Sequence, residues 1–287
     1  MTDDGGTGGG GPGPPRPATA PGPWRPSRLW HPGTPAGQAP APGWGPLPEL
    51  LLALTIVTGL VDAVSILALG RVFVANMTGN VVFVGFAIVG APGFSLSASL
   101  FALAGFLVGA VLGGTVATRL GHDRAEHLRA VAAAELLLVA VALVVAATSG
   151  APSVSHGTLH LPGASGATAL AFSGPVADVL ALLLATAMGV QNAAARKLSV
   201  PDLTTTVLTM TLTGIGADAK AGHRGQLVFG RRLVVVATML GGGILGAWLV
   251  LQVSPVAALA LAAFVLLVTT AIAVAAARAP AAWRAGG

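Results

Sequence analysis

Residues 58–80 read TGLVDAVSILALGRVFVANMTGN, and residues 188–214 read MGVQNAAARKLSVPDLTTTVLTMTLTG. Both stretches hold a polar motif inside apolar sequence, and the run GLVDA at 59–63 aligns with GVQNA at 189–193 at an offset of 130 residues. Each motif is followed by a segment that carries Thr or Asn. Because unpaired polar groups cost free energy in an apolar surrounding, two matching clusters indicate a duplicated unit with a shared role.

The composition indicates a membrane protein. Of the 287 residues, 54% are hydrophobic and 9% are charged, and the mean hydropathy is +0.82. Soluble domains carry roughly 25% charged residues, so this chain has too little polar surface to face water. We therefore predict an all-α polytopic bundle with the lipid bilayer as its partner. The net charge of +5 does not indicate nucleic-acid binding, because Lys and Arg lie in short loops that set membrane orientation.

The apolar stretches fall into two length classes. Six are long enough to cross a core of about 30 Å at about 1.5 Å per residue: residues 47–69, 97–118, 130–148, 176–195, 233–252 and 256–277. Two others, 74–90 and 202–218, are shorter or more polar.

The distribution of cations favours six spans over eight. If all eight stretches crossed, the 15 Lys and Arg would divide nine to six between the two sides. If the two short stretches enter and leave on one face, 14 lie on one side and only Arg71 on the other. Positive charge concentrates on the cytoplasmic side, so we predict six full spans plus two re-entrant or broken segments, with both termini cytoplasmic. The alternative is eight spans with a parallel repeat.

Three spans in each repeat make the two repeats inverted, since an odd number of crossings reverses the second copy. We expect repeat 1 at 47–148, an extracytoplasmic loop at 149–175 and repeat 2 at 176–280. A disordered, Pro/Gly-rich cytoplasmic tail is expected at 1–46 and a short C-terminal tail at 281–287. A second match, GFLVGA at 105–110 with GGILGA at 242–247, has an offset of 137. Its glycines have the spacing that permits close helix packing.

Asp62 is the foremost candidate for a functional residue. It lies in an apolar span without a nearby cation, so we expect it to bind a proton or cation. A carboxyl that only fixes helix packing is the alternative. Glu135 is expected near the headgroups, five residues into a span that begins near Ala130. Neutral groups that could line a polar path, or equally join helices, are Asn76, Thr78, Asn80, Gln191, Asn192, Thr205 and Thr209.

No catalytic set is visible in the sequence. The chain has no cysteine, which excludes disulfides, thiolate metal sites and cysteine nucleophiles. A GxSG run at 163–166 has no histidine within a span to serve as its base. We therefore expect no enzymatic activity, no cofactor and no metal site.

The runs GRVFVANMTGN at 70–80, GLVDA at 59–63 and GVQNAAARKLSVPDLTTTVLTMTLTG at 189–214 resemble the YoaK-like family. This family consists of bacterial multi-pass membrane proteins built on a domain of unknown function numbered 1275. The resemblance covers residues 47–280 and implies a location in the bacterial inner (plasma) membrane.

These observations favour transport. We expect a small-solute or ion transporter or channel, with protons among the candidate ions, whose path runs between residues 76–80 and 204–213. The alternative is a membrane scaffold or stress-related accessory protein that transports nothing, in which the polar residues join helices.

Overall fold

The computed structural model describes residues 43–150, 172, 174–200, 203, 209–217, 222–278 and 282–284. All regular elements in this part of the chain are helical, which confirms the predicted fold class. They are α1 (Leu47–Ala68), α2 (Met77–Ile88), α3 (Leu96–Leu120), α4 (Arg124–Thr148), α5 (Gly174–Leu198), α6 (Thr209–Ala217), α7 (Gly222–Gln252), α8 (Pro255–Arg278) and the 3₁₀ turn η1 (Ala282–Arg284).

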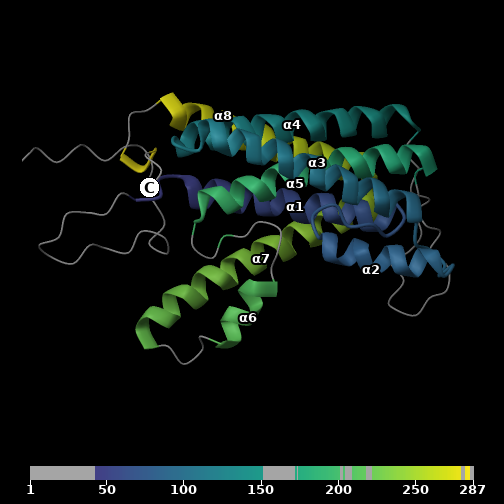
Figure 1. Cartoon of the computed structure of the whole chain (residues 1–287), viewed down its shortest axis with the longest axis horizontal. Helices are drawn as coiled ribbons and strands as arrows, with labels where there is room; N and C mark the ends of the chain where they lie inside the picture. The colour runs from purple at the N-terminus through teal and green to yellow at the C-terminus, as the bar shows by residue number, and fades with distance from the viewer. Residues whose placement is uncertain are drawn as a thin grey trace, which may run out of the picture.

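Six of these helices are long and apolar enough to cross a membrane, as predicted. They are α1, α3, α4, α5, the part of α7 from Val228 to Gln252, and α8. Local signals set their starts: Ser95 caps α3 by accepting from the Ala98 N–H at 3.2 Å, and Asp123 caps α4. In Figure 1, α1, α3, α4, α5 and α8 run side by side along the long axis of the molecule, whereas α7 is inclined to them and its first half lies away from the others.

The two remaining helices are too short to span. α2 has 12 residues and α6 has nine, whereas a crossing needs about 20. In Figure 1, α2 begins part-way along the bundle and runs to the end at which α3 starts. The chain therefore turns back after α1 and leaves on the side that it entered, as a re-entrant segment does.

The contacts between helices have the symmetry of an inverted repeat. Taking α1, α3 and α4 as the mates of α5, α7 and α8, the contact of α1 with α7 is matched by that of α5 with α3. Likewise α1 packs on α8 as α5 packs on α4, and the mates α4 and α8 pack on each other. These relations indicate a two-fold internal repeat, and the three spans in each repeat make the second copy inverted, as predicted.

Glycines fix the register within each matched contact. Gly109 of α3 lies against the Thr186 carbonyl of α5, and Gly242 of α7 lies against the Ile56 carbonyl of α1. Thr186 and Ile56 are 130 positions apart, which is the offset of the first motif. One turn further on, Gly113 meets Val190 and Gly246 meets Leu60 in the same way.

The structure corrects the second sequence match. Because Gly109 and Gly242 occupy equivalent positions, α3 and α7 are related by an offset of 133. The offset of 137 predicted from GFLVGA and GGILGA is therefore wrong by about one helical turn. Glycines recur at this spacing in both helices, so a sequence match cannot choose between adjacent turns.

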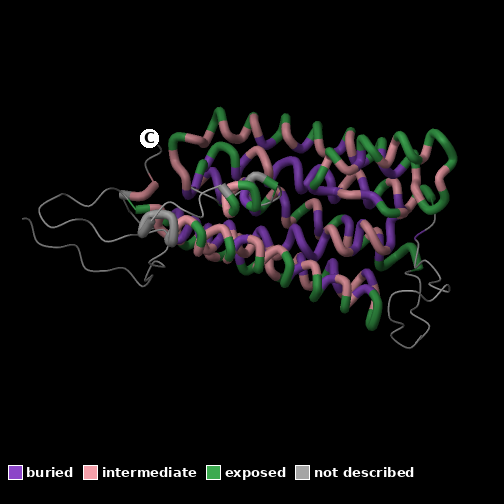
Figure 2. Tube along the Cα trace, turned by 90° about the horizontal axis from the view of Figure 1, so that it is seen from below, coloured by how far each residue is buried: buried purple, intermediate pink, exposed green. Residues whose placement is uncertain are grey.

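α1 and α5 form the centre of the bundle. In the apolar core of each of these helices 61% of the residues are buried, against 22–33% in the other four spans. Figure 2 shows the exposed residues on the outer helices, where large apolar side chains such as Leu107 and Ile244 face outward. The motif-bearing helices are thus the ones shielded from lipid.

Two predicted boundaries were wrong. The span in α4 starts at Arg124 rather than near residue 130, and the span in α7 starts at Val228, within a helix that begins at Gly222, rather than at 233. Both helices extend past their apolar stretches through basic residues, which hydropathy alone reads as loop. The predicted tail at 1–46 and loop at 149–175 fall mostly outside the described residues and stay predictions.

Candidate functional site

Asp62 lies beneath the loop that joins α1 to α2, residues 69–76, which we call the re-entrant loop. Its carboxyl interacts with the backbone N–H groups of Val74 and Ala75, two residues that are themselves buried. The Oδ1 atom is buried and has no hydrogen-bond partner. A buried carboxyl oxygen without a partner is unfavourable unless it holds a proton or a cation. The carboxyl is therefore suited to bind one of these.

The polar residues at the end of the re-entrant loop and in the first turn of α2 divide into two kinds. Asn80 is fully buried and clamps the Phe73 backbone: its Oδ1 accepts from the Phe73 N–H at 2.8 Å, and its Nδ2 donates to the Phe73 carbonyl at 2.5 Å. Asn76 and Thr78 are exposed instead. Asn80 thus holds the loop over Asp62, and only Asn76 and Thr78 are free to line a path.

Gln191 joins the two repeats at the centre of the bundle. Its Nε2 donates to the Thr58 hydroxyl of α1 at 2.9 Å, and its Oε1 is buried without a partner. Thr58 in turn donates to the Leu54 carbonyl at 3.1 Å. Gln191 therefore bonds across the interface between α1 and α5.

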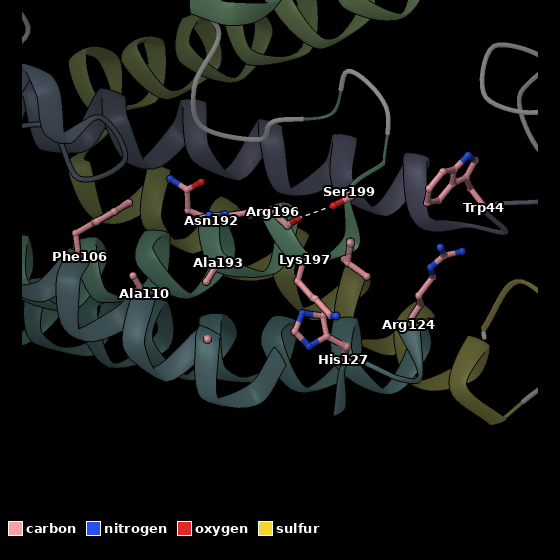
Figure 3. Close-up of a pocket in the computed structure, with 13 residues that line it drawn as sticks. Trp44, Phe106, Ala110, Arg124, His127, Asn192, Ala193, Arg196, Lys197 and Ser199 are labelled. Carbon is pink, nitrogen blue, oxygen red and sulfur yellow. Dashed lines mark hydrogen bonds between the residues drawn. The ribbon is translucent and has the colours of Figure 1, made fainter. Parts of the chain in front are cut away.

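Asn192, the repeat mate of Asp62, lines an open pocket of about 800 Å³. The pocket lies between α3, α4 and α5 and extends to the loop that follows α5 (Figure 3). The loops that follow α1 and α5 begin alike, because Arg71 and Ser199 near their starts both have left-handed φ values, of 57° and 48°. Asp62 is covered by its loop, whereas Asn192 faces a pocket within the described part of the chain. Thr204 and Thr205, which the offset of 130 pairs with Val74 and Ala75, lie outside the described residues.

The threonine segment is described only in part. Thr205 lies outside the described residues. Thr209 is exposed, and its carbonyl accepts from the Thr213 hydroxyl at 2.9 Å. In the part of the chain that the structure describes, α2 contacts α3 and α6 contacts α7, but α2 and α6 do not touch. A path between these two segments stays a prediction.

Glu135 is a candidate that the sequence analysis placed wrongly. Because α4 begins at Arg124, Glu135 lies near the middle of the span rather than near the headgroups. The residue is fully buried, and neither carboxyl oxygen has a hydrogen-bond partner. It shares a helix face with His127, which is eight residues earlier. The basic residues after Asp123 were the signal in the sequence that α4 begins before residue 130, which places Glu135 deeper in the span.

At one end of the bundle, acidic groups are paired with arginines. Arg284 of η1 donates to both Asp123 oxygens: its Nε lies 3.3 Å from Oδ1 and 3.1 Å from Oδ2, and its Nη2 lies 2.5 Å from Oδ2. These hydrogen bonds hold the pKa of Asp123 below its ordinary value. Glu126 pairs with Arg129 one turn along α4. Among the described residues, no three His, Asp or Glu side chains gather as a metal site would require.

The sequence pattern of the family described as protein of unknown function DUF1275 matches residues 50–272, from α1 into α8. The chain belongs to this family. The transmembrane protein YoaK (UPF0700) of Bacillus subtilis strain 168 is 31% identical over 169 residues, which are 59% of this chain and 65% of YoaK. The chain thus spans just under two thirds of that relative's length. No solved structure matches. The predicted YoaK-like resemblance is confirmed.

Proposed function

We propose that this membrane protein moves a small solute or ion by exposing a central polar site alternately to the two sides. One observation carries the proposal: among the described residues, the two equivalent positions of an inverted repeat have different surroundings. Asp62 is covered by the Val74–Ala75 backbone, whereas Asn192 lines an open pocket. Inverted repeats that exchange such states are a common basis of alternating access.

The proposed roles follow from the environments of the side chains. Asp62 would hold the coupling proton or cation, since its buried Oδ1 lacks a partner. Asn192 would contact the solute that enters from the pocket. Gln191 and Thr58 would form the axis about which the repeats move, because their hydrogen bond joins α1 to α5. The proposed activity is transport rather than catalysis.

We further propose that the open pocket faces the cytoplasm of a bacterial cell, with both chain termini on that side of the inner membrane. Arg124, Arg196 and Lys197 line the pocket, while Arg71 follows α1 at the opposite end. Positive charge on the cytoplasmic side supports this orientation.

The test is proton flux into liposomes that contain the purified protein and the pH-sensitive dye pyranine, with potassium and valinomycin holding the membrane potential at zero. Wild-type protein should dissipate an imposed pH gradient faster than protein-free liposomes do. Asp62→Asn should slow this at least about tenfold, because an amide does not ionise. Glu126→Gln, which removes a carboxyl at the end of the bundle, is the matched control and should behave as wild type.

Equal flux through wild-type protein and Asp62→Asn, at equal reconstitution, would contradict the role of Asp62. Wild-type liposomes that hold the gradient like empty ones would contradict proton-coupled transport and favour the scaffold.

A further inference from the structure

The open pocket beside Asn192 is positively charged and has no acidic wall. Its lining includes Arg124, His127, Arg196 and Lys197, and none of its lining residues is Asp or Glu. The remaining lining is formed by Trp44, Phe106, Ala110, Gly114, Gly121, Asn192, Ala193, Leu198 and Ser199. Figure 3 shows Lys197 of α5 beside His127 of α4, with Arg196 immediately before Lys197 on the same helix.

These cations are not neutralised within the described part of the chain. The acidic residues that flank Arg124 in the sequence, Asp123 and Glu126, pair with Arg284 and Arg129. Arg196 and Lys197 are exposed, and neither has an ion pair in the described residues. Arg124 lies over the Trp44 ring, 4.7 Å from its centroid. Unpaired cations that converge on a concave surface attract an anion.

His127 supplies a second, independent indication of a ligand. Its side chain is fully buried and lines the pocket. The Val116 backbone is near enough to serve one ring nitrogen, but neither Nδ1 nor Nε2 makes a hydrogen bond of ordinary geometry, and the second nitrogen has no candidate partner among the described residues. Buried polar groups in native proteins are nearly always satisfied. A ligand oxygen in the pocket would accept the missing hydrogen bond.

We propose that this pocket binds an organic phosphate, with the phosphate held by Arg196, Lys197 and His127. Several cations suit a group with more than one negative charge, and guanidinium and ammonium groups are the usual phosphate ligands. The volume of about 800 Å³ is far larger than one phosphate needs and lies in the range of small-molecule sites. The organic part would lie against Trp44, Phe106 and Leu198.

Such a phosphate could belong to a soluble metabolite or to a lipid headgroup. If it is a transported solute, that role rests on the proposed function, but binding itself does not. Binding is measured at equilibrium without flux, so the two ideas can fail separately.

The first arm is calorimetric titration of glycerol 3-phosphate into the full chain in dodecyl maltoside, without phosphate in the buffer. We expect saturable binding that Arg196→Gln/Lys197→Gln weakens at least about tenfold, since charge-assisted hydrogen bonds are lost. Arg119→Gln/Arg278→Gln removes the same charge from exposed residues outside the pocket and should change the affinity less than about twofold.

The second arm places the same proteins in nanodiscs of phosphatidylcholine alone or with phosphatidylglycerol, and counts retained lipid by native mass spectrometry. Phosphatidylglycerol retained by wild type and by the control pair, but lost by the pocket pair, assigns the site to lipid. Glycerol 3-phosphate binding without lipid retention assigns it to a soluble phosphate.

The proposal is overturned if neither probe binds, if both double variants bind equally, or if succinate binds as tightly as glycerol 3-phosphate. Unchanged melting temperature shows that the pocket pair is folded. Should that pair not fold, Lys197→Gln against Arg119→Gln makes the same comparison.

Discussion

At the residue scale, the polar side chains of this protein separate by whether their hydrogen bonds are made. Asn80 uses its amide to hold the Phe73 backbone on both sides, which is a structural task. Asp62 and Glu135 each keep a buried oxygen without a partner. A buried oxygen without a partner is costly in an apolar interior. It therefore indicates a functional site better than a fully hydrogen-bonded side chain does.

Asn80→Ala tests this division. Removing the amide leaves the N–H and carbonyl of Phe73 unpaired near a buried loop, and we expect a loss of about 2–4 kcal/mol of stability. The measurement is the unfolding transition in detergent, followed by circular dichroism. Thr78→Ala, two residues earlier and exposed, should stay within about 0.5 kcal/mol of wild type. Similar transitions for both variants would show that Asn80 does not clamp the loop.

The sequence indicated which residues are polar inside the membrane, but not their roles. Asp62 stood out because a carboxylate is rare in an apolar span. Asn80 looked like the same kind of residue as Asn76, and only the tertiary structure separates a buried clamp from an exposed side chain. Glu135 was misplaced because hydropathy reads the basic first turns of α4 as loop.

At the element scale, close contacts through glycine join the repeats. Gly105, Gly109 and Gly113 of α3 face backbone atoms of α5, and Gly242 and Gly246 of α7 face α1. The helices approach so closely because no side chain intervenes, which is the usual way in which helices associate without water. Both contacts pack a repeat's first helix against the other repeat's second span.

Gly109→Ala should therefore destabilise the protein by about 1–3 kcal/mol, because its methyl group would meet the Thr186 carbonyl. Gly114 lies on the same helix with open space beside it. Gly114→Ala is the matched control, and it should be neutral or stabilising by up to about 1 kcal/mol. The measurement is the melting temperature of each variant in detergent, compared with that of the wild type. Equal melting temperatures would contradict the close α3–α5 contact.

At the scale of the whole molecule, the described helices form one bundle in which each repeat completes the other. Most contacts of α1 and α5 are made with helices of the opposite repeat. Neither repeat alone would bury the polar motif that it carries. The site is consequently a property of the pair.

The six-span topology predicts opposite accessibility for two exposed residues. Val89, at the end of α2, and Arg278, at the end of α8, should lie on opposite sides of the membrane. Val89→Cys and Arg278→Cys can each be labelled with a membrane-impermeant maleimide in intact cells and in inverted vesicles, because the chain has no native cysteine. Labelling of both from one side would instead indicate eight spans.

The sequence by itself determined that the chain is a duplicated, six-span membrane protein, because hydropathy, span length and cation placement are local properties. It also identified the motif pair of Asp62 and Asn192. Only the tertiary structure decided the register of α3 against α5 and of α7 against α1, since equally spaced glycines fit in several ways. It also decided that Asp62 is covered while Asn192 faces a basic pocket. That difference depends on side chains brought together from α3, α4 and α5, which no local pattern records.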